Sequence, residues 1–390
     1  MTPPRGNKSE RAGPPGRHSP LLVILFSYLF VLLLALNVDP LTKEHPMFAV
    51  GGDHLEYIDM ARSPAEAHSP PYCYRLLVPA IARLLPFDLA VSFYMLTLLF
   101  ITGAGILLYY LLGEMGENGF YSLIGVCLFY SLNWGVKFAV FDFWLTDPAL
   151  YFFSVLYLLL LIKGKGTGAS LSLCFAVLSK EAALFLIPLA YTLKARRFFD
   201  TRALLRMFAI GAAPVALFLV LRFAVHSTTA YNPISLWSDI GIRRLTSDLV
   251  GYVRGGTVGT WGILVLALPF FSGREGWGIA LRSLPFLALV YMQPFFAVNV
   301  DRLLVFAFPV VVPLAVKGLR RIARKLELSR WMVVGYALIP LVLILIKSGY
   351  QSPSPEMRLL ALAIWSLPVV AAKYFGQRGE DSDSPVSWGD

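Results

Sequence analysis

The sequence predicts an all-α membrane protein that crosses the bilayer many times. Of its 390 residues, 57% are hydrophobic and only 15% are charged, whereas soluble domains carry about 25% charged residues. The apolar residues form runs of roughly 20, the length that a helix needs to span the hydrocarbon core. Most basic residues lie in the short loops between these runs, so the positive-inside rule explains the net charge of +10 better than nucleic-acid binding does.

The first apolar run is predicted to be a transmembrane helix and not a cleaved signal peptide. The stretch from Leu21 to Leu36 is long for the apolar part of a signal, and no small-residue cleavage site precedes Asp39. Two of the three cysteines lie inside apolar runs and no CxxC pattern occurs, which argues against a disulfide framework or a zinc site. The predicted spans are 20–38, 88–112, 119–137, 147–163, 202–225, 257–272, 277–298, 302–318, 331–347 and 357–374.

The two ends of the chain differ from its apolar middle. Residues 1–19 are rich in Pro, Gly and Arg, and residues 376–390 are mostly polar. Such segments bury too little apolar surface to fold. We therefore expect two disordered cytoplasmic tails around a single transmembrane domain that covers residues 20–375.

The segment 168–193 is predicted to be a hairpin of two short helices. Lys180 and Glu181 lie near its middle, and both flanks, 163–166 and 194–197, are basic. If both flanks are cytoplasmic, the segment must enter the membrane and return, and each arm of about 11–13 residues reaches only part of the way across. With this hairpin the chain has about 11–12 membrane segments. Every strongly basic loop and both termini then fall on the cytoplasmic side.

This topology collects the unusually placed ionisable residues on the other, non-cytoplasmic face. That face holds the loops 39–75, 141–148, 226–256, 299–303 and 348–356, together with the tip of the hairpin. Ionisable side chains in or beside membrane segments are costly and usually mark a functional cavity. No P-loop, GxGxxG or HExxH sequence occurs, so a cytoplasmic nucleotide site and a zinc-protease site are not indicated.

The first outer loop contains the sequence DHLEYIDMAR, residues 53–62, which predicts a short helix lying in the membrane interface. Asp53 at its start is a candidate general base or ligand for a substrate hydroxyl, and Glu56 and Tyr57 are candidate substrate contacts. Alternatively, Asp53 caps the helix and Glu56 is its capping-box partner. The two interpretations are compatible.

Two further segments carry candidate residues. Arg75 lies in an apolar stretch between two tyrosines, where a guanidinium would hold a phosphate in a bidentate manner, whereas Arg83 is expected to extend toward lipid head groups. Asp142 and Asp147 precede a predicted span, with Pro148 suited to its first turn. Asp147 is either a substrate contact or a simple helix cap.

The last candidates are basic residues near the same face. Lys180 is expected to neutralise a lipid-linked phosphate that Glu181 orients; alternatively, both residues belong to ion pairs with other helices. Arg302, at the start of a late span, is a second candidate phosphate ligand or an anchor at the membrane interface.

Together these segments resemble the GT-C superfamily, the polytopic glycosyltransferases that use polyprenyl- or dolichyl-phosphate sugars. The resemblance is carried by the acidic first loop and by the sequences YRLLVPAIARLL, DPALYFFSVLYLLLLIKGK, LSKEAALFLIPL and DRLLVFAFPVVVPLA. It implies a GT-C-like bundle in which Asp53 is the catalytic base, Asp142 or Asp147 a second acidic contact, and Lys180 and Arg302 phosphate ligands. Because His54 follows Asp53 where many members have a second acid, the second carboxylate is Glu56 or lies elsewhere, and the resemblance leaves open whether a divalent metal takes part.

The expected activity is transfer of a sugar from a polyprenyl-phosphate donor to a hydroxyl of a glycan, lipid or protein, with inversion. It would take place on the non-cytoplasmic face of a bacterial cell membrane. The alternatives are a transporter or lipid flippase, which also contains broken helices with buried charges, and a non-catalytic GT-C-like subunit. Against transport, the charges lie at one face and the other half of the chain has no matching broken segment.

Overall fold

The computed structural model describes residues 20–50, 52–195, 197, 199–228, 237–247, 249–251, 259–261, 268–297 and 300–346. Within these ranges every regular element is a helix, which confirms the predicted all-α class. Both predicted tails, the loop 348–356 and the span 357–374 lie outside the described residues, as do parts of the loop 226–256 and of the span 257–272.

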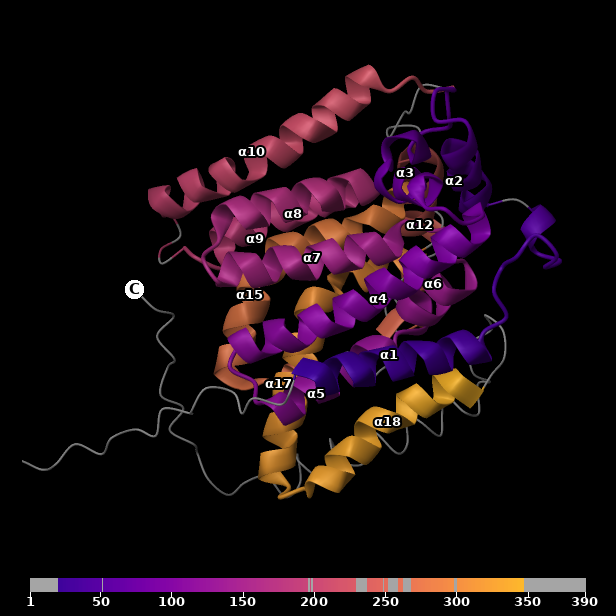
Figure 1. The fold of residues 1–390 in the computed structure, drawn as a ribbon. Coiled ribbons are helices and arrows are strands. Elements are labelled where there is room, and N and C mark those ends of the chain that lie inside the picture. Colours follow the sequence, from indigo (N-terminus) through magenta and orange to yellow (C-terminus); the bar gives the residue numbers. More distant parts are fainter. Residues whose placement is uncertain are drawn as a thin grey trace, which may run out of the picture.

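Helices α1, α4, α7 and α8 run roughly side by side, and α2, α3 and α12 gather at one end of the bundle (Figure 1). The α-helices are α1 (Pro20–Asn37), α2 (Asp53–Arg62), α3 (Leu77–Leu84), α4 (Leu89–Glu114), α5 (Gly119–Tyr130), α6 (Phe138–Phe141), α7 (Asp147–Ile162), α8 (Gly166–Ser179), α9 (Ile187–Thr192), α10 (Thr201–Ala224), α12 (Ile242–Ser247), α13 (Leu249–Gly251), α15 (Gly273–Met292), α16 (Val300–Leu304), α17 (Phe308–Lys325) and α18 (Arg330–Ile346). Shorter 3-10 or π turns are η1 (Phe48–Val50), η2 (Tyr72–Tyr74), η3 (Asn133–Lys137), η4 (Glu181–Leu186), η5 (Trp237–Gly241), η7 (Leu268–Phe271), η8 (Gln293–Phe296) and η9 (Val305–Ala307).

The chain is an integral membrane protein. Five stretches of the described residues are long and apolar enough to cross a membrane: Pro20–Asn37, Leu89–Glu114, Thr201–Ala224, Gly273–Phe296 and Asp301–Lys325. The pair formed by Gly119–Tyr130 and Asn133–Phe141, bent by 61°, would make a sixth. Shorter apolar helices, among them α7 and α8, complete the bundle.

The helices divide into a central and a peripheral set. In the candidate span that contains α17, 100% of the apolar 18-residue stretch is buried. In α10 only 22% of the corresponding stretch is buried. On α17 the ring of Phe308 lies 4.7 Å from the ring of Phe129 on α5, measured between centroids. On α10, Leu205, Phe208 and Phe223 are exposed. Apolar side chains exposed along such a helix suit contact with lipid tails, so α10 lies at the edge of the bundle.

The predicted hairpin forms from α8, η4 and α9, and its two ends lie beside the same half of α10. Near the start of α8, the Ser170 hydroxyl donates a hydrogen bond to the Ile210 carbonyl at 2.8 Å. At the end of the return arm, the Asp200 backbone N–H donates to the Tyr191 hydroxyl at 3.1 Å. Leu178, next to the tip, instead packs in a cluster with Leu221, near the other end of α10. The segment therefore enters and returns, as predicted.

Helices break at the end of the bundle where the hairpin has its tip. Lys180 leaves helical geometry, with φ −165° and ψ 133°, between α8 and η4. The opposite end is held by ion pairs. There the buried Lys317 Nζ lies 3.3 Å from a Glu117 carboxylate oxygen and 2.8 Å from one of Glu275, which ties α17 to α15 and to the turn before α5. Ion pairs therefore hold the helices together at this end, whereas the other end is marked by the break in the hairpin at Lys180.

Candidate functional site

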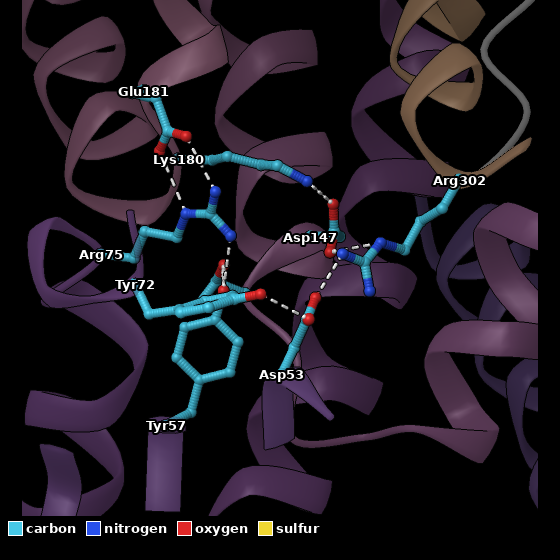
Figure 2. Close-up of polar contacts among 9 residues, drawn as sticks. Asp53, Tyr57, Tyr72, Arg75, Asp147, Lys180, Glu181 and Arg302 are labelled. Atoms are coloured by element: carbon cyan, nitrogen blue, oxygen red, sulfur yellow. Dashed lines mark hydrogen bonds and ion pairs between the residues drawn. The ribbon is translucent and has the colours of Figure 1, made fainter. Parts of the chain in front are cut away.

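Eight polar side chains from five separate parts of the chain meet at the interrupted end of the bundle (Figure 2). They are Asp53 and Tyr57 of α2, Tyr72 of η2, Arg75, Asp147 of α7, Lys180 and Glu181 at the hairpin tip, and Arg302 of α16. We call this group the polar cluster. Within it, the positions predicted from sequence at Asp53, Arg75, Asp147, Lys180, Glu181 and Arg302 form direct ion pairs with one another.

Asp53 is held from two sides. One carboxylate oxygen accepts a hydrogen bond from the Tyr72 hydroxyl at 2.8 Å, and the other forms a short ion pair with the Arg302 guanidinium, 249 residues away in the sequence. Burial alone would raise the pKa of Asp53, but the charge and hydrogen bond of Arg302, with help from Tyr72, lower that pKa to about 2. Asp53 is therefore ionised and firmly placed.

Asp147 and Lys180 form the most deeply buried pair. The Lys180 Nζ atom lies 2.6 Å from Asp147 Oδ1, and the two side chains are only 4% and 5% exposed. Pro148 in the first turn of α7 fits the predicted helix start, but the N-cap is Thr146 and no side-chain capping bond forms. The other oxygen of Asp147 lies 3.7 Å from Arg302 Nε. Asp147 therefore acts here as a shared partner of two cations and not as a helix cap.

Arg75 has its guanidinium fully engaged. Its Nε and Nη2 atoms donate to the two carboxylate oxygens of Glu181, at 3.0 and 2.8 Å, and Nη1 donates to the Tyr57 hydroxyl at 2.8 Å. Burial raises the pKa of Tyr57 to about 12, so this hydroxyl stays neutral. Glu181 thus pairs with Arg75 and not with its neighbour Lys180. The pairing connects the hairpin tip to the end of η2.

Asp142 lies close to the polar cluster but lacks a cationic partner of its own. Its carboxylate is buried, and the Oδ1 atom has no hydrogen-bond donor among the described residues. Burial raises the pKa of Asp142 to about 7, and the nearby charges of Asp53 and Asp147 act in the same direction, while Arg302 opposes them. An orphaned buried acceptor of this kind is available to a ligand hydroxyl.

Replacing Asp142 by asparagine is expected to stabilise the protein more at pH 8 than at pH 5. The raised pKa means that the folded state keeps a proton that the unfolded state loses above about pH 4. The free energy of unfolding therefore falls as the pH rises from about 4 toward 7, because the buried carboxyl group of Asp142 resists losing its proton. Asparagine resembles the protonated form and avoids this loss. The apparent melting temperature in detergent should show a gap between Asp142→Asn and wild type that widens with pH; a gap that narrows would contradict the assignment.

Glu56, another predicted site residue, also lies outside the polar cluster. It accepts a hydrogen bond from the Ser69 backbone N–H at 3.4 Å. Helix α2 begins at Asp53, as the sequence predicts, but its N-cap is Gly52 and no side-chain capping bond is present. The capping-box alternative for Asp53 and Glu56 is therefore not what the structure contains.

Two residues of this region were not identified from the sequence. Tyr72 donates to Asp53, yet nothing in the sequence distinguishes it from the other tyrosines around Arg75. Tyr151 lies one helical turn after Asp147, and its buried hydroxyl has no hydrogen-bond partner among the described residues. Tyr151 could have been identified from its spacing, because residues four positions apart, such as Asp147 and Tyr151, lie on one face of a helix.

A resident divalent metal does not fit this arrangement. Among the described residues, no three His, Cys, Asp or Glu side chains are placed to hold a metal ion. The two carboxylates that would be the obvious ligands, Asp53 and Asp147, face the guanidinium of Arg302 between them. A cationic side chain occupies the position between the carboxylates.

No protein-family model matches the chain, and no curated protein matches it. Among solved structures, the chain is similar to an oligosaccharyltransferase from Archaeoglobus fulgidus, crystallised with a tethered acceptor peptide that contains the NVT sequon. The identity is 12%, the TM-score is 0.48, and the match covers 89% of this chain and 55% of that one. The chain thus spans about half the length of that oligosaccharyltransferase.

Proposed function

We propose that the chain is a membrane glycosyltransferase of the GT-C type, which transfers a sugar from a polyprenyl-phosphate donor to an acceptor hydroxyl with inversion. The observation that carries this proposal is the polar cluster itself. Three carboxylates and three cations from distant parts of the chain meet, mostly buried, at one end of an apolar bundle. Buried charges are costly in a membrane protein and are kept mainly where function needs them.

Each part of the cluster has a role in this proposal. Asp53 is the general base, because it is ionised and the Tyr72 hydroxyl fixes its position. Arg302 and Lys180 stabilise the negative charge of the leaving phosphate. Asp142, with its orphaned oxygen, accepts a hydrogen bond from a donor or acceptor hydroxyl.

The remaining site residues have supporting roles. Asp147 orients the two cations that it touches. Arg75, Glu181 and Tyr57 form a hydrogen-bonded wall of the substrate site. Glu56, outside the polar cluster, is a further proposed substrate contact.

The chemistry is a single displacement. The acceptor oxygen attacks the anomeric carbon and forms a new C–O bond, while the bond from that carbon to the phosphate oxygen breaks on the opposite face. The bonding electron pair leaves with the polyprenyl phosphate, whose charge becomes more negative by one. The acceptor proton moves to the Asp53 carboxylate and then to solvent. General-base assistance of this kind contributes about 10²–10⁴ in rate.

In this proposal the polar cluster faces the non-cytoplasmic side of a bacterial cell membrane, and both termini are cytoplasmic. This orientation is supported by the basic residues at the opposite end of the bundle, because the positive-inside rule places basic loops in the cytoplasm. The basic residues at that end include Lys163, Lys165, Lys194, Arg274, Arg320, Arg321, Arg324 and Lys325. The acceptor is a glycan, a lipid or a protein.

The test is release of polyprenyl phosphate by the purified protein in nanodiscs. The protein is supplied with polyprenyl phosphates that carry different single sugars and with a membrane extract as the source of acceptor. We expect sugar-dependent release of polyprenyl phosphate for at least one donor, with the sugar recovered on an acceptor. In proteoliposomes, movement of the intact donor across the bilayer without its consumption would favour the transporter alternative and contradict the proposal.

A further inference from the structure

The polar cluster is electrically balanced without substrate. Asp53, Asp147 and Glu181 supply three negative charges, and Arg75, Lys180 and Arg302 supply three positive ones, all in ion pairs. A phosphate ester that enters this site brings at least one further negative charge. Placing an uncompensated charge in a buried site is costly, so the phosphate must take a cation from a carboxylate that now holds it.

The three cations differ in how many of their side-chain nitrogen atoms donate hydrogen bonds. Arg75 donates three hydrogen bonds, two of them in a bidentate pair with Glu181. Lys180 forms a 2.6 Å pair that is almost fully buried. The Nε atom of Arg302, in contrast, is buried without a hydrogen-bond acceptor among the described residues, because the nearest oxygen of Asp147 is 3.7 Å away. Among these three cations, Arg302 is thus the one with a buried nitrogen atom that has no acceptor among the described residues, and a ligand can bind there.

The two carboxylates around Arg302 also differ. The Asp53 side chain is 16% exposed, compared with 5% for Asp147, so an entering ligand reaches Asp53 first. Asp147 also remains tied to Lys180. Asp53 keeps a second partner, the Tyr72 hydroxyl at 2.8 Å, and would therefore stay in place if Arg302 released it.

Resting on the proposed function, we propose that a phosphate ester takes over the guanidinium of Arg302 from Asp53, so that binding of the donor itself releases the catalytic base. The ion pair of Arg302 and Asp53 is then the resting state of the site. Arg302 couples the two substrates: the hydroxyl of an acceptor is activated only after a phosphate has bound.

The electrostatics of Asp53 agree with this order of events. While Arg302 is paired with it, the pKa of Asp53 lies at about 2, far too low for efficient removal of a proton from a hydroxyl. Burial acts in the opposite direction and is the larger single influence. Transfer of Arg302 to the phosphate therefore raises the basicity of Asp53. Without donor, the site activates neither acceptor nor water.

The test is the affinity of the site for phosphate in Asp53→Asn. Asparagine has nearly the same shape but no charge, so it no longer competes for Arg302. If the paired state outweighs the released state by about ten to one, the variant should bind phosphate about tenfold more tightly than wild type, although it lacks the base. Binding is measured in nanodiscs, by calorimetry or by fluorescence of a labelled polyprenyl phosphate. Unchanged or weaker binding in the variant would overturn the proposal.

Two control variants localise the effect. Tyr72→Phe removes the other partner of Asp53 and leaves the competition for Arg302 in place, so phosphate affinity should stay within about twofold of wild type. In the Arg302→Ala background, Asp53→Asn should no longer tighten binding, because the contested cation is gone. Persistent tightening there would indicate a general charge effect and reject the exchange. Arg302→Gln, which also removes the charge but keeps a polar side chain of similar length, replaces Arg302→Ala if the latter does not fold.

Two probes separate this inference from the proposed function. Polyprenyl phosphate and inorganic phosphate share the recognised group but differ in the lipid tail. Tightening for both, with the lipid-linked form bound at lower concentration, supports both proposals. Tightening with inorganic phosphate alone would keep the exchange but reject the lipid-linked donor. Consumption of donor without any tightening in Asp53→Asn would keep the glycosyltransferase and reject the exchange.

Discussion

Replacing Asp53 by asparagine is expected to lower the turnover of sugar transfer by about 10²–10⁴, the usual contribution of a positioned general base. The substitution removes the proton acceptor but retains the size of the side chain and its ability to accept a hydrogen bond from Tyr72. Donor binding should persist and, by the exchange proposed for Arg302, become tighter, so the loss should fall on kcat and not appear as a higher KM. Initial rates of polyprenyl phosphate release at saturating donor measure the effect.

The matched control for this variant is Asp59→Asn. Asp59 lies on the same helix, α2, but its side chain is exposed and takes no part in the polar cluster. We expect this variant to transfer sugar at the rate of wild type and to purify with the same yield. If Asp53→Asn also kept full turnover, Asp53 would not be the base, and Asp142 would become the better candidate because of its raised pKa.

Replacing Lys180 by methionine is expected to lower the free energy of unfolding by about 3–5 kcal/mol. The substitution leaves Asp147 charged in an almost fully buried position, and breaking one side of a buried ion pair has a cost of this size. Arg302, at 3.7 Å from Asp147, compensates only in part. Unfolding by sodium dodecyl sulfate in mixed micelles, followed by circular dichroism, measures the change.

Two comparisons make this expectation specific. Lys163→Met breaks the ion pair with Glu114, whose N–O distance is 3.1 Å and whose partners are about 40% exposed (38% and 42%). Such exposed pairs contribute only about 0–1 kcal/mol. The double variant Lys180→Met/Asp147→Asn, which removes both charges, should recover much of the lost stability. A loss in Lys180→Met no larger than in Lys163→Met would show that the Asp147 pair is not buried as described.

The hairpin of α8 and α9 could be predicted from sequence because its cause is local. Basic residues on both flanks of 168–193 leave only a topology that enters and returns, and Lys180 and Glu181 at the tip lie where the chain leaves its helical path. The helical class follows in the same way, because apolar runs in a bilayer must satisfy their backbone hydrogen bonds internally.

The pairing inside the polar cluster could not be predicted, because it depends on how distant segments pack. Residue type indicates that a buried charge needs a partner, but it does not indicate which partner. Glu181 lies beside Lys180 in the sequence and yet pairs with Arg75, 106 residues away. The hydroxyl of Tyr72 on Asp53 has no sequence signature at all. The sequence thus indicates that these charged residues need partners, but it does not indicate which residues the partners are.

The distance in sequence between Asp53 and Arg302 has a consequence for how the protein is made. The two residues are 249 positions apart, so a ribosome that adds 5–20 residues per second needs roughly 10–50 s to supply the partner of Asp53 after Asp53 itself has emerged. During this time one carboxylate oxygen of Asp53 lacks the guanidinium that covers it in the finished protein. A nascent chain halted before residue 302 should therefore leave Asp53 reachable by a water-soluble carboxyl-modifying reagent, and only the finished chain should protect it.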